Sequence, residues 1–87
     1  MEIKSKILND EGLHARPAAI LVKEAGQFQS DVVIKVADKE ANAKSIMSLM
    51  SLGLKKDSEI VIEANGDDAK QALDKINELI NNKFNLH

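Results

Sequence analysis

The chain has 87 residues, the length of one small domain, and its 44% apolar and 30% charged residues are typical of a folded chain. A formal net charge of −2, with two phenylalanines as the only aromatic residues, argues against nucleic-acid binding, which calls for a basic face and stacking rings. The absence of cysteine excludes disulfides and thiolate metal sites, and no apolar run approaches the roughly 18 residues that span a bilayer.

The first half of the sequence predicts a strand, a helix and a hairpin. Apolar or small residues alternate with charged residues over positions 2–8, which is the period-2 pattern of a strand. Pro17 suits the first position of a helix and Gly26 its end, and the apolar residues between them share one face. A second strand at 32–36, a turn at Asp38 and Lys39 and a third strand at 40–43 complete this half.

The second half predicts two helices around one strand. Ser45 suits the N-cap of a short helix that Gly53 closes, and residues 60–62 form a clear strand. Asp68 with Gln71 resembles a capping box at the start of the strongest helical pattern, in which apolar residues recur at i, i+3, i+4 and i+7. These apolar residues are Ala69, Ala72, Leu73, Ile76, Leu79 and Ile80.

The element order β-α-β-β-α-β-α predicts an α+β fold. Each amphipathic helix has one face to bury, and a sheet of four strands offers one apolar face that receives the helices. We therefore expect an open-faced β-sandwich, with a mainly antiparallel four-stranded sheet and three helices on one face, in a single domain over residues 1–87. Because aromatic residues are scarce, the core is expected to be aliphatic and built from Ile, Leu, Val, Ala and Met.

The segment at residues 12–17 contains the chemistry that we expect of this chain. It places His14 in the connection between the first strand and the first helix. A helix N-terminus exposes backbone N–H groups and carries about half a positive charge, so it favours phosphate and disfavours imidazolium. A neutral imidazole has a free lone pair and can act as a nucleophile toward phosphorus. A histidine in a polar loop is also commonly a solvated side chain, and position alone leaves that alternative open.

The neighbours of His14 suit the same chemistry. The planar guanidinium of Arg16 fits a phosphoryl group or an acidic partner surface. Since Pro17 lacks an N–H, the amides that cradle a phosphate must come from Ala15 and Arg16. Gly12 lets the loop turn sharply and leaves His14 approachable. Taken singly, Arg16 has an ordinary explanation as a surface residue and Pro17 as a helix boundary.

Two longer motifs surround these residues. Residues 12–18 read Gly-Leu-His-Ala-Arg-Pro-Ala, and residues 44–47 read Lys-Ser-Ile-Met. Both motifs, with residues 49–53, resemble the active-site segment and the regulatory-serine helix of the HPr family, the histidine phosphocarriers of the bacterial phosphoenolpyruvate:sugar phosphotransferase system. The likeness extends over essentially the whole chain, in its length and in the order of its elements.

The resemblance implies a relay of phosphoryl groups. Enzyme I, with phosphoenolpyruvate as the ultimate donor, would phosphorylate Nδ1 of His14. His14 would then deliver the group to a sugar-specific enzyme IIA, with Arg16 assisting. Such a protein is a carrier and not an enzyme, and it is expected to need no cofactor and no metal.

Ser45 has a structural explanation as an N-cap, and the resemblance adds a regulatory one. In Gram-positive-type members of the family, an ATP-dependent HPr kinase/phosphorylase phosphorylates this serine. A phosphate at a helix N-terminus is tolerated, and its charge would oppose an acidic partner or create a surface for another, such as a transcription regulator. Ile46, Met47 and Met50 are expected to remain exposed as a docking patch, although core packing is the simpler explanation for some of them. Ser48 departs from the family, which commonly carries glycine there.

Three other functions fit parts of the sequence. A regulatory relative of HPr would act on a transcription regulator through its phosphoserine, but such relatives can lack the phosphorylatable histidine, and His14 is present. An acyl carrier would have an Asp before its serine and an all-helical chain, whereas Lys44 precedes Ser45 and residues 60–62 predict a strand. A plain α+β interaction module would not explain the two motifs together.

The remaining expectations concern location and assembly. A carrier that docks different partners in turn is expected to be a monomer in the cytoplasm, without membrane insertion and without nucleic-acid partners. The second histidine, His87, is expected to be frayed and solvated.

Overall fold

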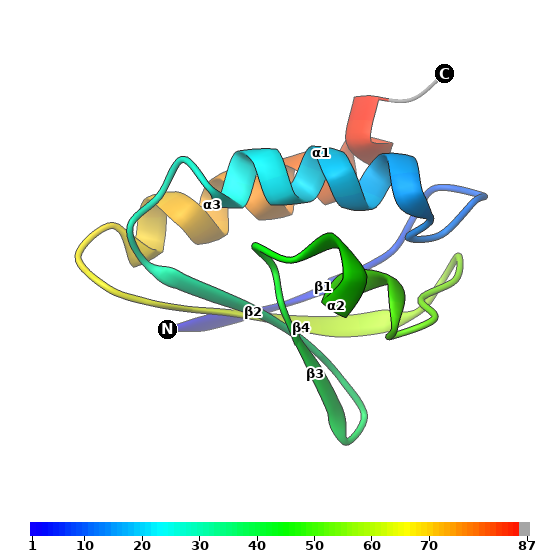
Figure 1. Cartoon of the computed structure of the whole chain (residues 1–87), viewed down its shortest axis with the longest axis horizontal. Helices are drawn as coiled ribbons and strands as arrows, with labels where there is room; N and C mark the ends of the chain where they lie inside the picture. The colour runs from blue at the N-terminus through cyan, green and yellow to red at the C-terminus, as the bar shows by residue number, and fades with distance from the viewer. Residues whose placement is uncertain (86–87) are drawn as a thin grey trace.

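The computed structural model describes residues 1–85 and contains one four-stranded antiparallel sheet with helices on one face (Figure 1). The strands are β1 (Glu2–Lys6), β2 (Asp31–Val36), β3 (Lys39–Asn42) and β4 (Glu59–Asn65), in the spatial order β1-β4-β2-β3. The helices are α1 (Ala15–Ala25), α2 (Ile46–Met50) and α3 (Ala69–Asn81), followed by the 3-10 turn η1 (Lys83–Asn85). The predicted open-faced sandwich and its β-α-β-β-α-β-α order are confirmed. The expectation for His87 lies outside the described residues.

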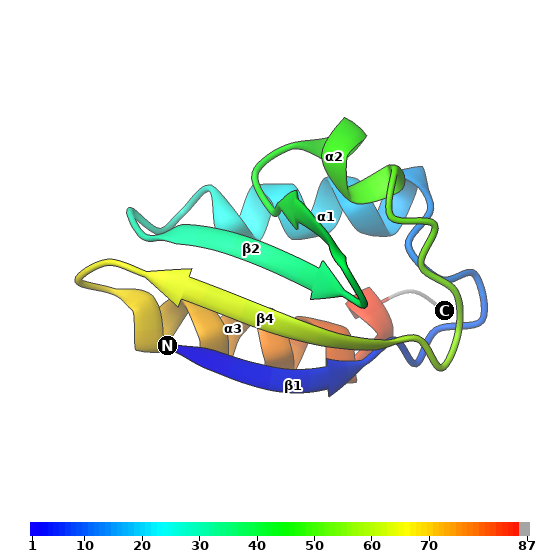
Figure 2. The same ribbon diagram turned by 90° about the horizontal axis from the view of Figure 1, so that it is seen from below.

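Alternating side chains specify the register of the sheet. Ile62 at the centre of β4 pairs with Ile3 of β1 on one side and with Ile34 of β2 on the other, so that an apolar row crosses the sheet. The next residues along, Lys35 and Glu63, belong to the uncovered face and form an ion pair with 3.0 Å between Nζ and Oε2. Figure 2 shows this layering, with α1 and α3 behind the strands. A shift of one residue in the pairing between two strands would turn charged side chains into the core, so the apolar pattern excludes any other register.

The core lies between the sheet and the apolar stripes of α1 and α3. The six α3 residues expected to face the core are all buried, which confirms the predicted stripe. Phe84, in the turn after α3, is buried as well, so the core includes one aromatic ring. The expectation of methionine in the core is wrong, because all three methionines lie at the surface. No helix within residues 1–85, α3 included, combines the length and apolarity needed to cross a membrane.

Several element boundaries differ from those predicted by one to three residues, and two of these differences have a local physical reason. α1 begins at Ala15, so Pro17 is its third residue and not its first. Proline is accommodated there because the first turn of a helix leaves its N–H groups without intrahelical acceptors. The hairpin between β2 and β3 turns at Ala37 and Asp38, one residue earlier than expected, and Ala37 adopts a left-handed φ of 52°.

Asp68 stands at the N-cap of α3, but its carboxylate does not make the side-chain cap that the predicted capping box requires. It accepts hydrogen bonds from the backbone N–H groups of Gln29, at 2.8 Å, and Ser30, at 2.9 Å, and from the Ser30 hydroxyl. The prediction fails because it considers only sequence neighbours, whereas Gln29 lies 39 residues away. The hydrogen bonds from Ser30 and Gln29 hold the pKa of Asp68 below its ordinary value.

Acid should weaken the contact between the Asp68 carboxylate and the loop that follows α1. Because the pKa of Asp68 is lowered in the folded state, its carboxylate stabilises the fold above the unfolded pKa of about 3.9, and the stabilisation disappears as the pH falls through the folded value. Urea unfolding should therefore show Asp68→Asn to be less stable than the wild type at neutral pH, with a difference that narrows in acid. Asp67→Asn, at the exposed neighbouring position, is the control and should match the wild type. A difference for Asp68→Asn that stays constant from neutral to acid pH would contradict this expectation.

Candidate functional site

His14 stands at the N-cap of α1, immediately before the first helical residue. Its backbone is extended, with φ −81° and ψ −173°, and its carbonyl oxygen accepts a hydrogen bond from the Ala18 N–H at 2.9 Å. The imidazole is exposed and, within residues 1–85, makes no capping hydrogen bond. The ring is therefore open to a partner that approaches from solvent.

The N-terminus of α1 offers an anion site beside the imidazole. Helix geometry leaves the N–H groups of Ala15 and Arg16 without intrahelical acceptors. Pro17 contributes no N–H, and the first turn of α1 contains no acidic side chain. The Arg16 side chain is exposed and adds a full positive charge to the partial charge of the helix end. Together these groups can stabilise a phosphoryl group bonded to the imidazole.

Backbone contacts anchor the loop that precedes His14. The Leu13 N–H donates to the Leu54 carbonyl at 3.1 Å, which ties the loop to the segment that follows α2. Gly12 has a left-handed φ of 68°, and a Cβ at this position would collide with the Leu54 carbonyl oxygen and lie 2.8 Å from the Cα of Lys55. Glycine is therefore required at position 12 both by the left-handed backbone conformation and by the close approach of the Leu54–Lys55 backbone.

Asn9, which sequence patterns alone did not single out, closes the same loop from the inside. Its Nδ2 donates to the Gly12 carbonyl at 2.6 Å, and its own carbonyl accepts from the Gly12 N–H at 3.1 Å. Asn9 is 5% exposed, and its Oδ1 is buried with no hydrogen-bond partner among residues 1–85. An asparagine three residues before a glycine is a common signal of such a turn, so the sequence did contain a clue.

Replacing Asn9 by alanine should lower the free energy of unfolding by about 1 kcal/mol, because the buried Gly12 carbonyl loses its side-chain donor. The loss is kept small because the unpartnered Oδ1 disappears at the same time. Equilibrium urea unfolding measures the change. Asn81→Ala, at an exposed position of α3, is a suitable control and should be neutral or slightly stabilising. An Asn9→Ala protein as stable as the wild type would show that this side chain does not hold the loop.

An open hollow of about 530 Å³ lies beside His14. Met50 from α2 and Lys55 from the following loop line it together with the imidazole. Lys56 and Asp10 also line it, and their exposed ion pair measures 3.1 Å between Nζ and Oδ1. The hydrogen bond within this pair lowers the pKa of Asp10 and raises that of Lys56. The hollow therefore brings together His14 of the segment at residues 12–18 and Met50 of the segment at residues 49–53.

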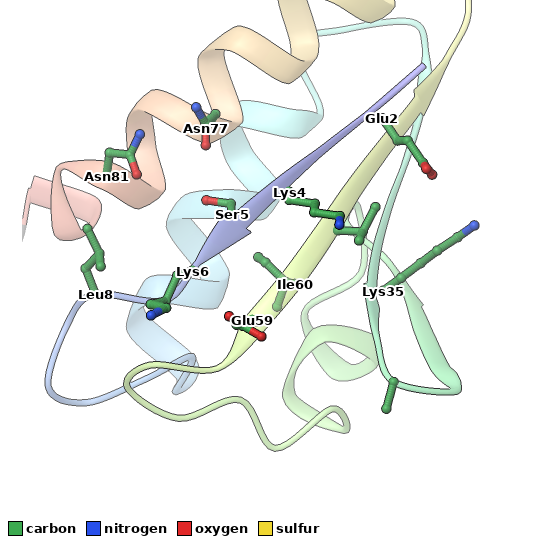
Figure 3. A pocket seen from close by; sticks show the side chains of 12 residues that line it. Glu2, Lys4, Ser5, Lys6, Leu8, Lys35, Glu59, Ile60, Asn77 and Asn81 are labelled. Carbon is green, nitrogen blue, oxygen red and sulfur yellow. The ribbon is translucent and has the colours of Figure 1, made fainter.

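A larger hollow, of about 720 Å³, lies along β1 and does not include His14 (Figure 3). Its charged side chains carry both signs, with Lys4, Lys6 and Glu59 among them. Figure 3 shows the lining side chains spread along β1, β4 and α3 without converging on one point. Size without convergent polar groups does not indicate a ligand site, so the candidate site is the smaller hollow at His14.

α2 lies beside α1 (Figure 2). It has Ser45 at its N-cap and three exposed apolar side chains. Ser45 is the N-cap, as predicted, and its Oγ accepts a hydrogen bond at 3.3 Å from the backbone N–H three residues later. Leu49 is fully buried and anchors the helix. Met47 is 83% exposed, and Ile46 and Met50 are 40% and 44% exposed. All three docking candidates thus lie at the surface, and their role in docking stays a prediction.

Three comparisons with known proteins give concordant results. The family described as PTS HPr component phosphorylation site matches residues 1–82. The phosphocarrier protein HPr of Mycoplasma capricolum is 48% identical over 73 residues, which cover 83% of this chain and 82% of that protein. The crystal structure of HPr-C-His from Thermoanaerobacter tengcongensis is 40% identical with a TM-score of 0.95, and covers 100% of this chain and 98% of that one. Crh of Bacillus subtilis, a catabolite repression protein described as a swapped, intertwined dimer, is 43% identical with a TM-score of 0.78 and 86% of each chain covered.

Proposed function

Because the chain belongs to the HPr family, the phosphocarrier proteins of the phosphotransferase system, we propose that His14 accepts a phosphoryl group from phospho-enzyme I and delivers it to sugar-specific enzyme IIA proteins. The ultimate donor is phosphoenolpyruvate. Proteins of this family carry the group and are not themselves catalysts. The single observation that supports the proposal most is the exposed imidazole of His14 at the N-cap of α1.

Transfer takes place at Nδ1 of His14. In the neutral ring the lone pair of this nitrogen attacks phosphorus, an N–P bond forms, and the bond between phosphorus and the donor breaks with its electron pair leaving on the donor. The phosphoryl oxygens then lie near the N–H groups of Ala15 and Arg16 at the positive end of α1. The Arg16 guanidinium stabilises the negative charge while the group passes between proteins. Delivery to enzyme IIA is the same exchange in reverse.

Docking is assigned to the exposed apolar side chains of α2. Ile46, Met47 and Met50, here called the α2 patch, lie at the surface, and Met50 adjoins the hollow of His14. Enzyme I and the enzyme IIA proteins would cover the patch in turn, and apolar burial around His14 would exclude water during transfer. Use of one surface by successive partners suits a monomer in the cytoplasm, which is the form proposed for this chain.

Ser45 is assigned as a regulatory phosphorylation site for an ATP-dependent HPr kinase/phosphorylase. The residue is partly exposed and stands at the N-cap of α2, where added negative charge is tolerated. A phosphoserine there would stand immediately before the α2 patch. It would oppose docking of an acidic partner and would offer a new surface to a transcription regulator.

Incubation with phosphoenolpyruvate, magnesium and purified enzyme I tests the carrier function. Intact mass should show one acid-labile phosphate, phosphorus NMR should show phosphohistidine bonded through Nδ1, and peptide mapping should place the group at His14. The Ser45→Ala variant should accept phosphate equally well. If the folded protein stays unlabelled while a control carrier is labelled, the carrier function is excluded. ATP-dependent labelling of Ser45 would then point to a regulatory relative.

A further inference from the structure

The sulfur atoms of this protein lie at its surface. The chain has three methionines and no cysteine, and Met1, Met47 and Met50 are 63%, 83% and 44% exposed. The buried core within residues 1–85 is built from Ile, Leu, Val, Ala, Pro and Phe, without sulfur. Exposed thioethers react with peroxides while the fold stays closed. Oxidation of this protein would therefore concentrate on α2 and on the first residue.

We propose that the α2 patch is an oxidation-sensitive surface, in which peroxide converts Met47 and Met50 to sulfoxides and thereby weakens docking and phosphate uptake by His14. The inference rests on the docking function proposed above for this patch. It adds a reversible control that acts on the surface of the carrier and leaves the fold and the imidazole unchanged.

The chemistry needs only the thioether and a hydroperoxide. The methionine sulfur attacks one peroxide oxygen, and an S–O bond forms as the O–O bond breaks. The sulfur is oxidised by two electrons, and hydrogen peroxide is reduced to water. The product is a polar, chiral sulfoxide. Methionine sulfoxide reductases convert it back to the thioether with two electrons from a dithiol, which becomes a disulfide while the oxygen leaves as water.

The positions of the two sulfurs determine what oxidation removes. Met47 is the most exposed large apolar residue of the described chain. Met50 lines the hollow beside His14, so a partner that reaches the imidazole also covers this side chain. A sulfoxide oxygen buried in that contact would need a hydrogen-bond donor that an apolar partner surface does not supply. Because the fully buried Leu49 anchors α2, the helix itself should remain in place.

Treatment with hydrogen peroxide, followed by peptide mass analysis, tests the inference. Met1, Met47 and Met50 should each gain one oxygen, with Met47 reacting before Met50. The KM for phosphorylation by enzyme I should rise about tenfold, which corresponds to ~1.4 kcal/mol, while kcat changes by less than about twofold. The thermal midpoint should not change, and methionine sulfoxide reductases supplied with a dithiol reductant should restore the original KM.

The matched control replaces both sulfurs of the patch and keeps the third. The double variant Met47→Leu with Met50→Leu preserves apolarity and approximate volume, and it retains Met1. The variant serves as its own reference: its KM for phosphorylation by enzyme I is measured before and after treatment with peroxide, and peroxide should not change that value.

Each contrary result has a distinct meaning. An unchanged KM in the wild type, with both sulfoxides verified, would overturn the inference and leave the carrier function intact. An equal rise in the leucine variant would also overturn it, because the damage would then lie outside the α2 patch. A lowered thermal midpoint would assign the effect to the fold, which again overturns it. If the unoxidised wild type accepts no phosphate, the proposed function fails and the inference with it.

Discussion

A His14→Ala variant is expected to accept no phosphate from phospho-enzyme I and to unfold at the same temperature as the wild type. The imidazole supplies the attacking nitrogen, and alanine leaves no nucleophile in its place. The cost in stability should be small, because the side chain is exposed and makes no capping bond within residues 1–85. Initial rates of label transfer from phosphoenolpyruvate, with catalytic enzyme I, measure acceptance. Far-ultraviolet circular dichroism on heating measures the fold.

Variants of Arg16 separate the nucleophile from the group that stabilises charge. Arg16→Ala should still accept phosphate, but about 10²-fold more slowly, because the nitrogen remains while an oriented positive charge is lost. Arg16→Lys should recover part of the rate, since it keeps the charge and loses the planar fork. An acid-labile phosphate on the His14→Ala variant would show that another residue is the acceptor.

Replacing Gly12 by alanine should lower the free energy of unfolding by about 3 kcal/mol. A Cβ at the left-handed φ of 68° costs roughly 1–2 kcal/mol, and its collision with the Leu54 carbonyl and the Lys55 backbone adds about 1–3 kcal/mol of strain. The backbone of Leu54 and Lys55 cannot simply move away, because the Leu13 N–H donates a hydrogen bond to the same Leu54 carbonyl. Phosphate acceptance should fall too, since the displaced loop carries His14.

Gly53 provides the matched control for Gly12. Its φ of 63° is nearly the same, but a Cβ there would meet no other atom of residues 1–85 within 4 Å. Gly53→Ala should therefore lower the free energy of unfolding only by the cost of the left-handed backbone conformation, roughly 1–2 kcal/mol. Urea unfolding of the two variants gives the difference directly. Equal losses would mean that the close approach of Leu54 contributes nothing to the requirement for glycine at position 12.

Elements with a sustained local pattern could be predicted from the sequence, and those set by distant contacts could not. The stripe of α3 repeats over 13 residues, so its buried face is evident from the spacing of apolar residues alone. The turn between β2 and β3 lies one residue earlier than the sequence predicts, because Ala37 adopts a left-handed conformation without the glycine or asparagine that usually marks one. The capping pattern assigns Asp68 to its own helix, whereas its strongest partners belong to the loop after α1.

The same distinction applies to the candidate site. The N-cap position of Ser45 could be predicted from the sequence. The start of α1 could be predicted only to within two residues of Pro17, which places His14 just before the helix but does not identify it as the N-cap. Asn9 could be placed in a turn, but the loop that it closes is also held by the hydrogen bond from Leu13 to Leu54, and the sequence gives no sign of that distant contact. Methionine is expected in the core because its side chain is apolar. α2 spans five residues and has Leu49 as its one fully buried side chain, which leaves Met47 and Met50 in solvent.

The uncovered face of the sheet offers a place for labels and tethers. The helices lie on one side of the strands (Figure 1). His14 and the α2 patch belong to these helices, whereas Lys35 and Glu63 alternate with the buried Ile34 and Ile62 and so lie on the opposite side of the sheet. A dye, a surface linker or a fused domain attached to that side would leave the transfer surface accessible. Because the chain contains no cysteine, a single cysteine in place of the exposed Lys4 of β1 would be a unique chemical handle there. A carrier labelled in this way could be followed, one molecule at a time, as it moves from one partner to the next.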